Sequence, residues 1–134
     1  MNDRTRRRNR ALAVVGAVAA AVGVWVVGEP LLGNDMVIRT EGQEPQDLGA
    51  SAFVIFSVFF SVLGWALLAL LERVTSRARL IWTVVALVFL AVSFFAPLTV
   101  EASGGTRAVL ALAHVAVAAV VIPVFRATST NAPR

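Results

Sequence analysis

Four long apolar segments without charged residues constrain this chain more than any other feature. They cover residues 11–28, 49–71, 80–98 and 108–125, and none contains Asp, Glu, Lys or Arg. At about 1.5 Å per residue, each is long enough to cross roughly 30 Å of hydrocarbon as a helix. Hydrocarbon offers no partners to backbone polar groups, so the segments must be helical. The pattern predicts an all-α membrane protein, a bundle of four transmembrane helices in one domain.

Composition supports the membrane assignment. The chain is 58% hydrophobic and 15% charged, whereas soluble domains are about half apolar and a quarter charged. This balance excludes a disordered chain and a water-soluble enzyme of ordinary build. The absence of cysteine excludes disulfides and cysteine nucleophiles. With a single histidine, no metal site is expected, and no cofactor is predicted.

The arginines predict an orientation. Ten of the twelve lie in residues 1–10, in residues 72–79 or after residue 125, and one lies in each of the other two connections, 29–48 and 99–107. The positive-inside rule therefore places both termini in the cytoplasm, with the helices in the plasma membrane. Residues 1–10 are then a basic cytoplasmic tail, 29–48 an outer loop and 127–134 a frayed cytoplasmic tail. A nucleic-acid arm is disfavoured because no aromatic or polar reading surface accompanies the basic residues.

The first segment has an alternative interpretation as a cleaved signal peptide, because a basic start precedes an apolar run. Residues 11–28 are long for such a segment, however, and no small-x-small cleavage site follows Gly28. The tryptophans also fit four spans. Trp25 is expected at the outer interface, and Trp65 and Trp82 toward the inner one.

Candidate site residues gather on the predicted outer side. His114 is the only ionisable residue within the four segments, and such residues usually face the bundle interior. Glu29, Glu101 and Arg107 lie on the same side of the membrane and are placed to form a polar mouth with it. The alternative is a set of solvated charges, with a neutral His114 bonded to a serine or to a backbone carbonyl.

The polar residues in the other helices each have two possible interpretations. Ser57, Ser61 and Ser93 either join helices or contact a ligand, and with Arg107 and Trp25 they complete the candidate ligand-binding set. Glu72 adjoins Arg73 at the inner surface, where an ion pair is the simplest use. A stripe of small residues in the first segment indicates close helix packing or a dimer contact; it comprises Ala13, Gly16, Ala20 and Gly23.

Several short motifs are spread along the chain. They are the segment from Trp65 to Arg73, then Arg77, Arg79, Trp82, Pro97, Leu98, Thr106, Arg107, His114, Ile122, Pro123 and Arg126. Together they resemble the motifs of a family of small actinobacterial membrane proteins with four helices and unknown function. The resemblance covers about residues 11–126. It implies the four-helix fold and no established activity, and it marks Glu72, Arg73, Arg107, His114 and Pro123 as pattern positions.

The first functional hypothesis is an accessory or lipophile-binding membrane subunit, because no complete catalytic motif is present. Its expected partners are membrane lipid, a lipophilic small molecule, and a second copy or another membrane protein. No nucleic acid is expected.

The second hypothesis is a membrane-embedded cyclase or isomerase of an isoprenoid-type substrate. A carboxyl group beside an apolar cavity can protonate an epoxide or alkene. Glu29, Glu101 or Glu72 would be the acid, and His114 or Asp35 its partner. A chain of 134 residues leaves little room for a cavity, so this hypothesis favours a homo-oligomer. The third hypothesis is a transporter or channel component, and its support is the single histidine within the apolar segments.

Overall fold

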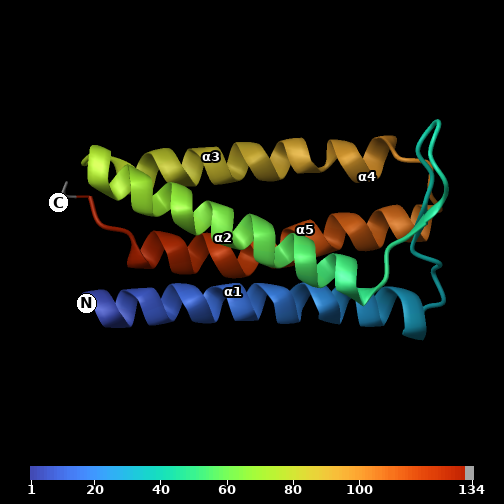
Figure 1. Ribbon diagram of the computed structural model, residues 1–134, viewed down its shortest axis with the longest axis horizontal. Coiled ribbons are helices and arrows are strands. Elements are labelled where there is room, and N and C mark those ends of the chain that lie inside the picture. The colour runs from blue at the N-terminus through green and yellow to red at the C-terminus, as the bar shows by residue number, and fades with distance from the viewer. Residues whose placement is uncertain (132–134) are drawn as a thin grey trace.

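The computed structural model describes residues 1–131, and it is a bundle of four long helices packed side by side (Figure 1). The all-α four-helix prediction is confirmed, and each helix is long and apolar enough to cross a membrane. The N-terminus and the end of α5 lie at one end together with the turn between α2 and α3, and we call this the terminal end. The opposite end, with residues 32–48 and the connection before α5, is the loop end. The helices are α1 (Asp3–Val26), α2 (Ala50–Val74), α3 (Ala78–Ser93), α4 (Phe95–Thr99) and α5 (Gly104–Thr128).

The arginine-rich segment is the first part of α1 rather than a separate tail. The helix begins at Asp3 because the Asn2 side chain accepts a hydrogen bond from the Thr5 N–H at 2.8 Å, which caps the helix. At its other end α1 continues into one π-helical turn, Val27–Leu31. Pro30 lies in this turn and has no N–H for the regular α-helical bond. The helix has no break between residues 10 and 11, and the cytoplasmic location of residues 1–10 stays a prediction.

The other helices also differ from their predicted bounds at the ends. The predicted helix 80–98 is broken at Phe94 into α3 and α4. The last helix runs through Pro123 to Thr128, so this proline does not end it. Residues 127–130 of the predicted frayed tail lie on the bundle, where Thr128 and Ser129 are buried. Residues 132–134 of that tail lie outside the described residues.

Small side chains let α1 approach its neighbours α2 and α5 closely. Its buried apolar residues are Ala13, Ala17 and Ala21, spaced four residues apart on one face. The predicted small stripe is only partly in this contact. A Cβ on Gly16 would lie 3.3 Å from Val120 of α5, whereas Gly23 is exposed with nothing nearby.

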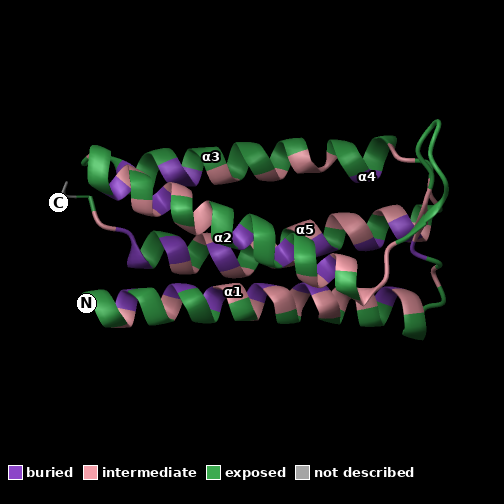
Figure 2. Cartoon of the chain, in the orientation of Figure 1, coloured by how far each residue is buried: buried purple, intermediate pink, exposed green. Residues whose placement is uncertain are grey.

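The α2 helix crosses the bundle diagonally, so α2 and α3 lie together at the terminal end and diverge toward the loop end (Figure 1). Trp82 holds α3 there, because its indole N–H donates to the Gly64 carbonyl at 2.8 Å and its ring contacts Phe125. Trp82 is buried, so its ring packs in the core of the bundle near the beginning of α3. Its place toward the inner membrane interface stays a prediction. Beyond Thr83 the described residues of α3 are exposed or half-buried (Figure 2).

Candidate functional site

The loop end is closed by the segment between α1 and α2. This segment contains a two-stranded hairpin, in which β1 (Val37–Ile38) pairs antiparallel with β2 (Gln46–Asp47). Gly42 has a positive φ of 77° in the turn between the strands. The Met36 side chain is completely buried. It lies among α1, α2 and α5, in a cluster with Ala21, Phe53, Val109 and Ala113.

One contact joins this segment to the π-helical turn after α1, and two join it to the beginning of α5. The Asn34 side-chain amide donates to the Gly28 carbonyl at 2.9 Å. The same side chain lies directly over Gly105, where an added Cβ would be 1.8 Å from the Asn34 oxygen. The buried Thr106 hydroxyl donates to the Asp35 carbonyl at 2.8 Å. Gly105 leaves room for the Asn34 side chain, and Thr106 bonds to the Asp35 carbonyl, so these two residues of α5 fix the position of the loop.

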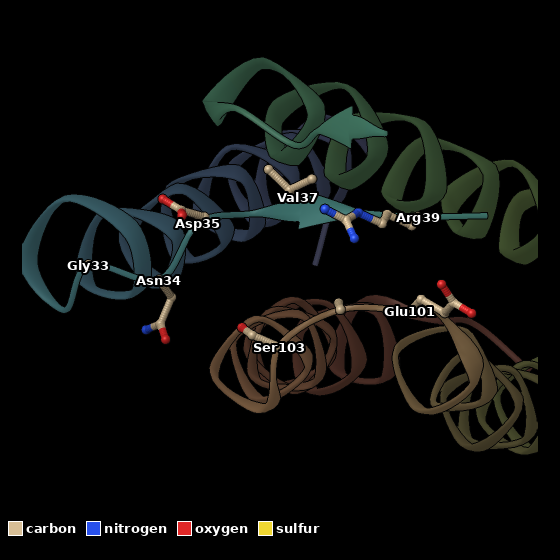
Figure 3. A pocket seen from close by; sticks show the side chains of 8 residues that line it. Gly33, Asn34, Asp35, Val37, Arg39, Glu101 and Ser103 are labelled. Carbon is tan, nitrogen blue, oxygen red and sulfur yellow. The ribbon is translucent and has the colours of Figure 1, made fainter. Parts of the chain in front are cut away.

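A hollow of about 520 Å³ lies between this segment and the turn before α5 (Figure 3). The Arg39 N–H donates to the Glu101 carbonyl at 2.9 Å across it. No ion pair joins their side chains within the part of the chain that the structure describes. Asp35, Arg39 and Glu101 are all exposed, so the hollow is a polar surface feature of mixed charge. Its lining comprises Gly33, Asn34, Asp35, Val37, Arg39, Glu101, Ala102 and Ser103.

Two candidate site residues at this end bond to each other. The Trp25 indole N–H donates to a Glu29 carboxylate oxygen at 2.6 Å. The two residues are four apart in sequence, and Glu29 lies in the π-helical turn. A hydrogen bond to a charged acceptor is about twice as strong as a neutral one. The carboxylate of Glu29 is thereby held at the helix end.

His114 bonds to its own helix. Its Nδ1 donates to the Leu110 carbonyl at 2.6 Å, since a carbonyl can only accept, and its ring centroid lies 6.4 Å from that of Phe94. Among residues 1–131 it has no hydrogen bond to Glu29, Glu101 or Arg107. Glu29, Glu101 and Arg107 lie at or next to the loop end, whereas His114 lies further along α5, and no hydrogen bond or ion pair within residues 1–131 joins the four side chains. The alternative of a histidine bonded to a backbone carbonyl describes the observed contact.

The three candidate serines differ in their contacts. Ser57 donates to the Phe53 carbonyl at 2.6 Å and Ser93 to that of Leu90 at 2.7 Å, both within their own helices. The buried Ser61 hydroxyl has no hydrogen-bond partner among the described residues, and neither has Arg107 Nε. A buried polar atom without a partner is unfavourable, so these two atoms remain available to a ligand or a water.

A polar network at the terminal end was not predicted. Arg10 donates two hydrogen bonds to the Glu72 carboxylate, at 2.6 and 3.2 Å, and both residues are buried. Glu72 thus pairs with Arg10 of α1 and not with its neighbour Arg73, which is exposed. Arg10 also donates to the Thr128 hydroxyl at 3.0 Å and to its carbonyl at 2.8 Å. The Thr130 N–H completes the network by donating to Glu72 at 2.9 Å.

The signal for this network lies in the helical periodicity. Arg6 and Arg10 share one face of α1 with Ala13 and Ala17, at spacings of four, three and four residues. Extension of the buried alanine face into the arginine-rich segment would have marked these two arginines as inward-facing. Arg6 pairs with Asp3 of the same helix, whereas the partners of Arg10, from α2 and the end of α5, depend on the packing of the bundle.

Within residues 1–131, no three His, Asp or Glu side chains lie close enough together to hold a metal ion. Glu72 is at the terminal end, while the other candidate acids Glu29, Asp35 and Glu101 are at the loop end. The structure therefore separates these carboxylates into two regions.

Comparison with known proteins identifies a family and no characterised relative. The chain matches DUF6069, described as a family of unknown function, over residues 2–131. No curated protein and no solved structure matches the chain.

Proposed function

The chain belongs to DUF6069, and we propose that this small multi-pass membrane protein is a lipophile-binding accessory subunit of a bacterial plasma membrane. The observation that carries the proposal is a set of linked phenylalanines on the exposed side of α2 and α3, which we call the phenylalanine face. It consists of Phe56, Phe59, Phe60 and Phe89, each exposed by 41–58%.

The rings of the phenylalanine face contact one another in a chain. Phe60 lies 5.2 Å from Phe59 and 6.5 Å from Phe56 on α2, and 5.3 Å from Phe89 on α3, between ring centroids. Such distances are typical of favourable aromatic pairs. The phenyl rings form an apolar surface across two diverging helices, suited to an isoprenoid chain or an aromatic ring.

The local bonds of the polar residues favour binding over acid catalysis. An acid-catalysed cyclase or isomerase needs a carboxyl group and its partner at one apolar cavity. Here Glu29 is bonded to Trp25, and Glu72 to Arg10. His114 is bonded to its own backbone. We therefore keep the enzyme as the alternative outcome of the test, together with a transporter or channel component.

The proposal includes the orientation and source expected from the arginines. Ten of twelve belong to the terminal end or the adjoining tail, which supports a cytoplasmic location for that end. The arginine-only basic set also agrees with an actinobacterial source.

Native mass spectrometry of the protein released from membranes tests the binding role. We expect one lipophilic molecule to be retained by the wild type and lost from a Phe60→Leu/Phe89→Leu variant, which keeps the surface apolar but removes the rings. Phe95→Leu is the matched control, because Phe95 is exposed and has no ring contact among the described residues. A wild-type protein carrying only bulk phospholipid would contradict the proposal. Conversion of the bound molecule by the wild type would favour the enzyme.

A further inference from the structure

A second hollow lies at the terminal end and is lined by basic and hydroxyl side chains. Its volume is about 240 Å³, and it lies between the α2–α3 turn, α3 and the end of α5. We propose that this arginine hollow binds the phosphate of an anionic phospholipid headgroup, with the acyl chains along the exposed surface of α3. The lining residues are Ser76, Arg77, Arg79, Leu80, Thr83, Arg126 and Asn131.

The positive charge of the arginine hollow is not neutralised by its own lining, which contains three arginines and no acidic residue. Arg77 and Arg126 have no side-chain hydrogen bond or ion pair with any residue that the structure describes. Glu72, near the end of α2, is bonded to Arg10 and to the Thr130 N–H, and among the described residues it has no ion pair with Arg77 or Arg126. Two guanidinium groups are therefore free to bind an anion.

The third arginine is fixed in place. Arg79 donates from Nε to the Ser129 hydroxyl at 2.9 Å and from one terminal nitrogen to the Ser129 carbonyl at 3.1 Å. Its other terminal nitrogen has no partner among the described residues. Guanidinium groups present planar arrays of donors that match phosphate oxygens. The geometry thus combines one oriented arginine with two unpaired ones.

An apolar surface begins at the rim of the hollow, and this distinguishes a lipid from a free phosphate ion. Leu80 lines the hollow, and Val84 and Leu87 follow it on one face of α3 at spacings of four and three residues. All three are more than half exposed. A headgroup held by the arginines would place its acyl chains against this face. Anionic lipids are also attracted to basic segments at the cytoplasmic surface.

This site lies on a different part of the bundle from the phenylalanine face. The inference needs only that the terminal end lies at a membrane surface, and it does not rest on the proposed lipophile-binding role. Variants of Phe60 and Phe89 are expected to keep the anionic lipid, so the failure of one proposal is distinguishable from the failure of the other.

The test uses the full chain in nanodiscs made from equal parts of phosphatidylglycerol and phosphatidylcholine, released for native mass spectrometry. We expect the wild type to retain one phosphatidylglycerol in preference to phosphatidylcholine. In Arg77→Gln/Arg126→Gln we expect its affinity to fall roughly 25-fold, from about fivefold for each arginine near an anionic surface. Arg4→Gln/Arg8→Gln is the control, because it removes the same charge from exposed positions of α1.

Equal retention of both lipids by the wild type would overturn the proposal, whatever the variants do. So would an equal loss in the control, since it would show attraction to charge in general. Inorganic phosphate and short-chain phosphatidylglycerol are then titrated as competitors. Displacement by the short-chain lipid alone supports a lipid site, whereas equal displacement by phosphate would overturn the lipid assignment.

Discussion

Arg10 and Glu72 are 62 residues apart in sequence and form a buried, doubly hydrogen-bonded ion pair at the terminal end. The pair connects α1 to α2, and its contacts with Thr128 and Thr130 bring the end of α5 into the same network. Removal of one partner would leave the other charge buried, which typically lowers stability by about 3–5 kcal/mol.

We therefore expect Glu72→Ala or Arg10→Ala to lower the free energy of unfolding in detergent by about 3 kcal/mol. The double substitution Arg10→Met/Glu72→Leu should recover most of this loss, because neither charge remains. Arg73→Ala is the control and should change the stability little, since Arg73 is exposed. Fully additive losses in the double variant would show that the two residues do not interact as described.

A second prediction concerns the contact between Gly28 and Val109. A Cβ on Gly28 would lie 2.4 Å from a Val109 methyl group. Gly28→Ala should therefore overpack this contact and lower the free energy of unfolding by about 1–3 kcal/mol, which is measured as a lower melting temperature. Gly23→Ala in the same helix is the matched control, because nothing lies within 4 Å of its added Cβ. A second substitution, Val109→Ala, should restore part of the stability, and the absence of any rescue would count against a direct clash.

A third prediction concerns Met36, which anchors the loop. Met36→Ala should create a cavity at the loop end and lower the stability by about 2–5 kcal/mol. It should also increase amide hydrogen exchange in residues 32–48 more than in the helices. Leu32→Ala provides the comparison, because Leu32 is 69% exposed. Unchanged exchange in the Met36 variant would mean that its burial does not hold the loop.

The fourth prediction concerns the orientation in the membrane. The chain contains no cysteine, so single cysteines can be introduced without a background signal. In intact cells, a membrane-impermeant maleimide should label Gln43→Cys in the loop between the β-strands. It should label Ser76→Cys in the α2–α3 turn only after the membrane is permeabilised. The reverse result would place the termini outside the cytoplasm.

Much of the fold could be predicted because its main signal is local. The four apolar segments predict the helices, and the structure extends three of them by a few residues at their ends. The broken helix at Phe94 and the helical arginine segment were missed, since the break and the cap by the Asn2 side chain each depend on a few local hydrogen bonds. The contacts of the candidate site residues were harder to predict from the sequence. Glu29 and His114 find their partners within one turn, but sequence alone did not choose those partners over more distant ones.

By itself the sequence determined the four-helix plan, because long apolar segments must satisfy their backbone hydrogen bonds internally. Only the tertiary structure decided which polar groups meet. Glu72 pairs with Arg10 rather than with adjacent Arg73 because its buried face turns toward α1. Trp82 contacts Phe125 in the core because α2, α3 and α5 converge at the terminal end. Helical periodicity is a property of neighbouring residues, whereas these pairings depend on how distant helices cross.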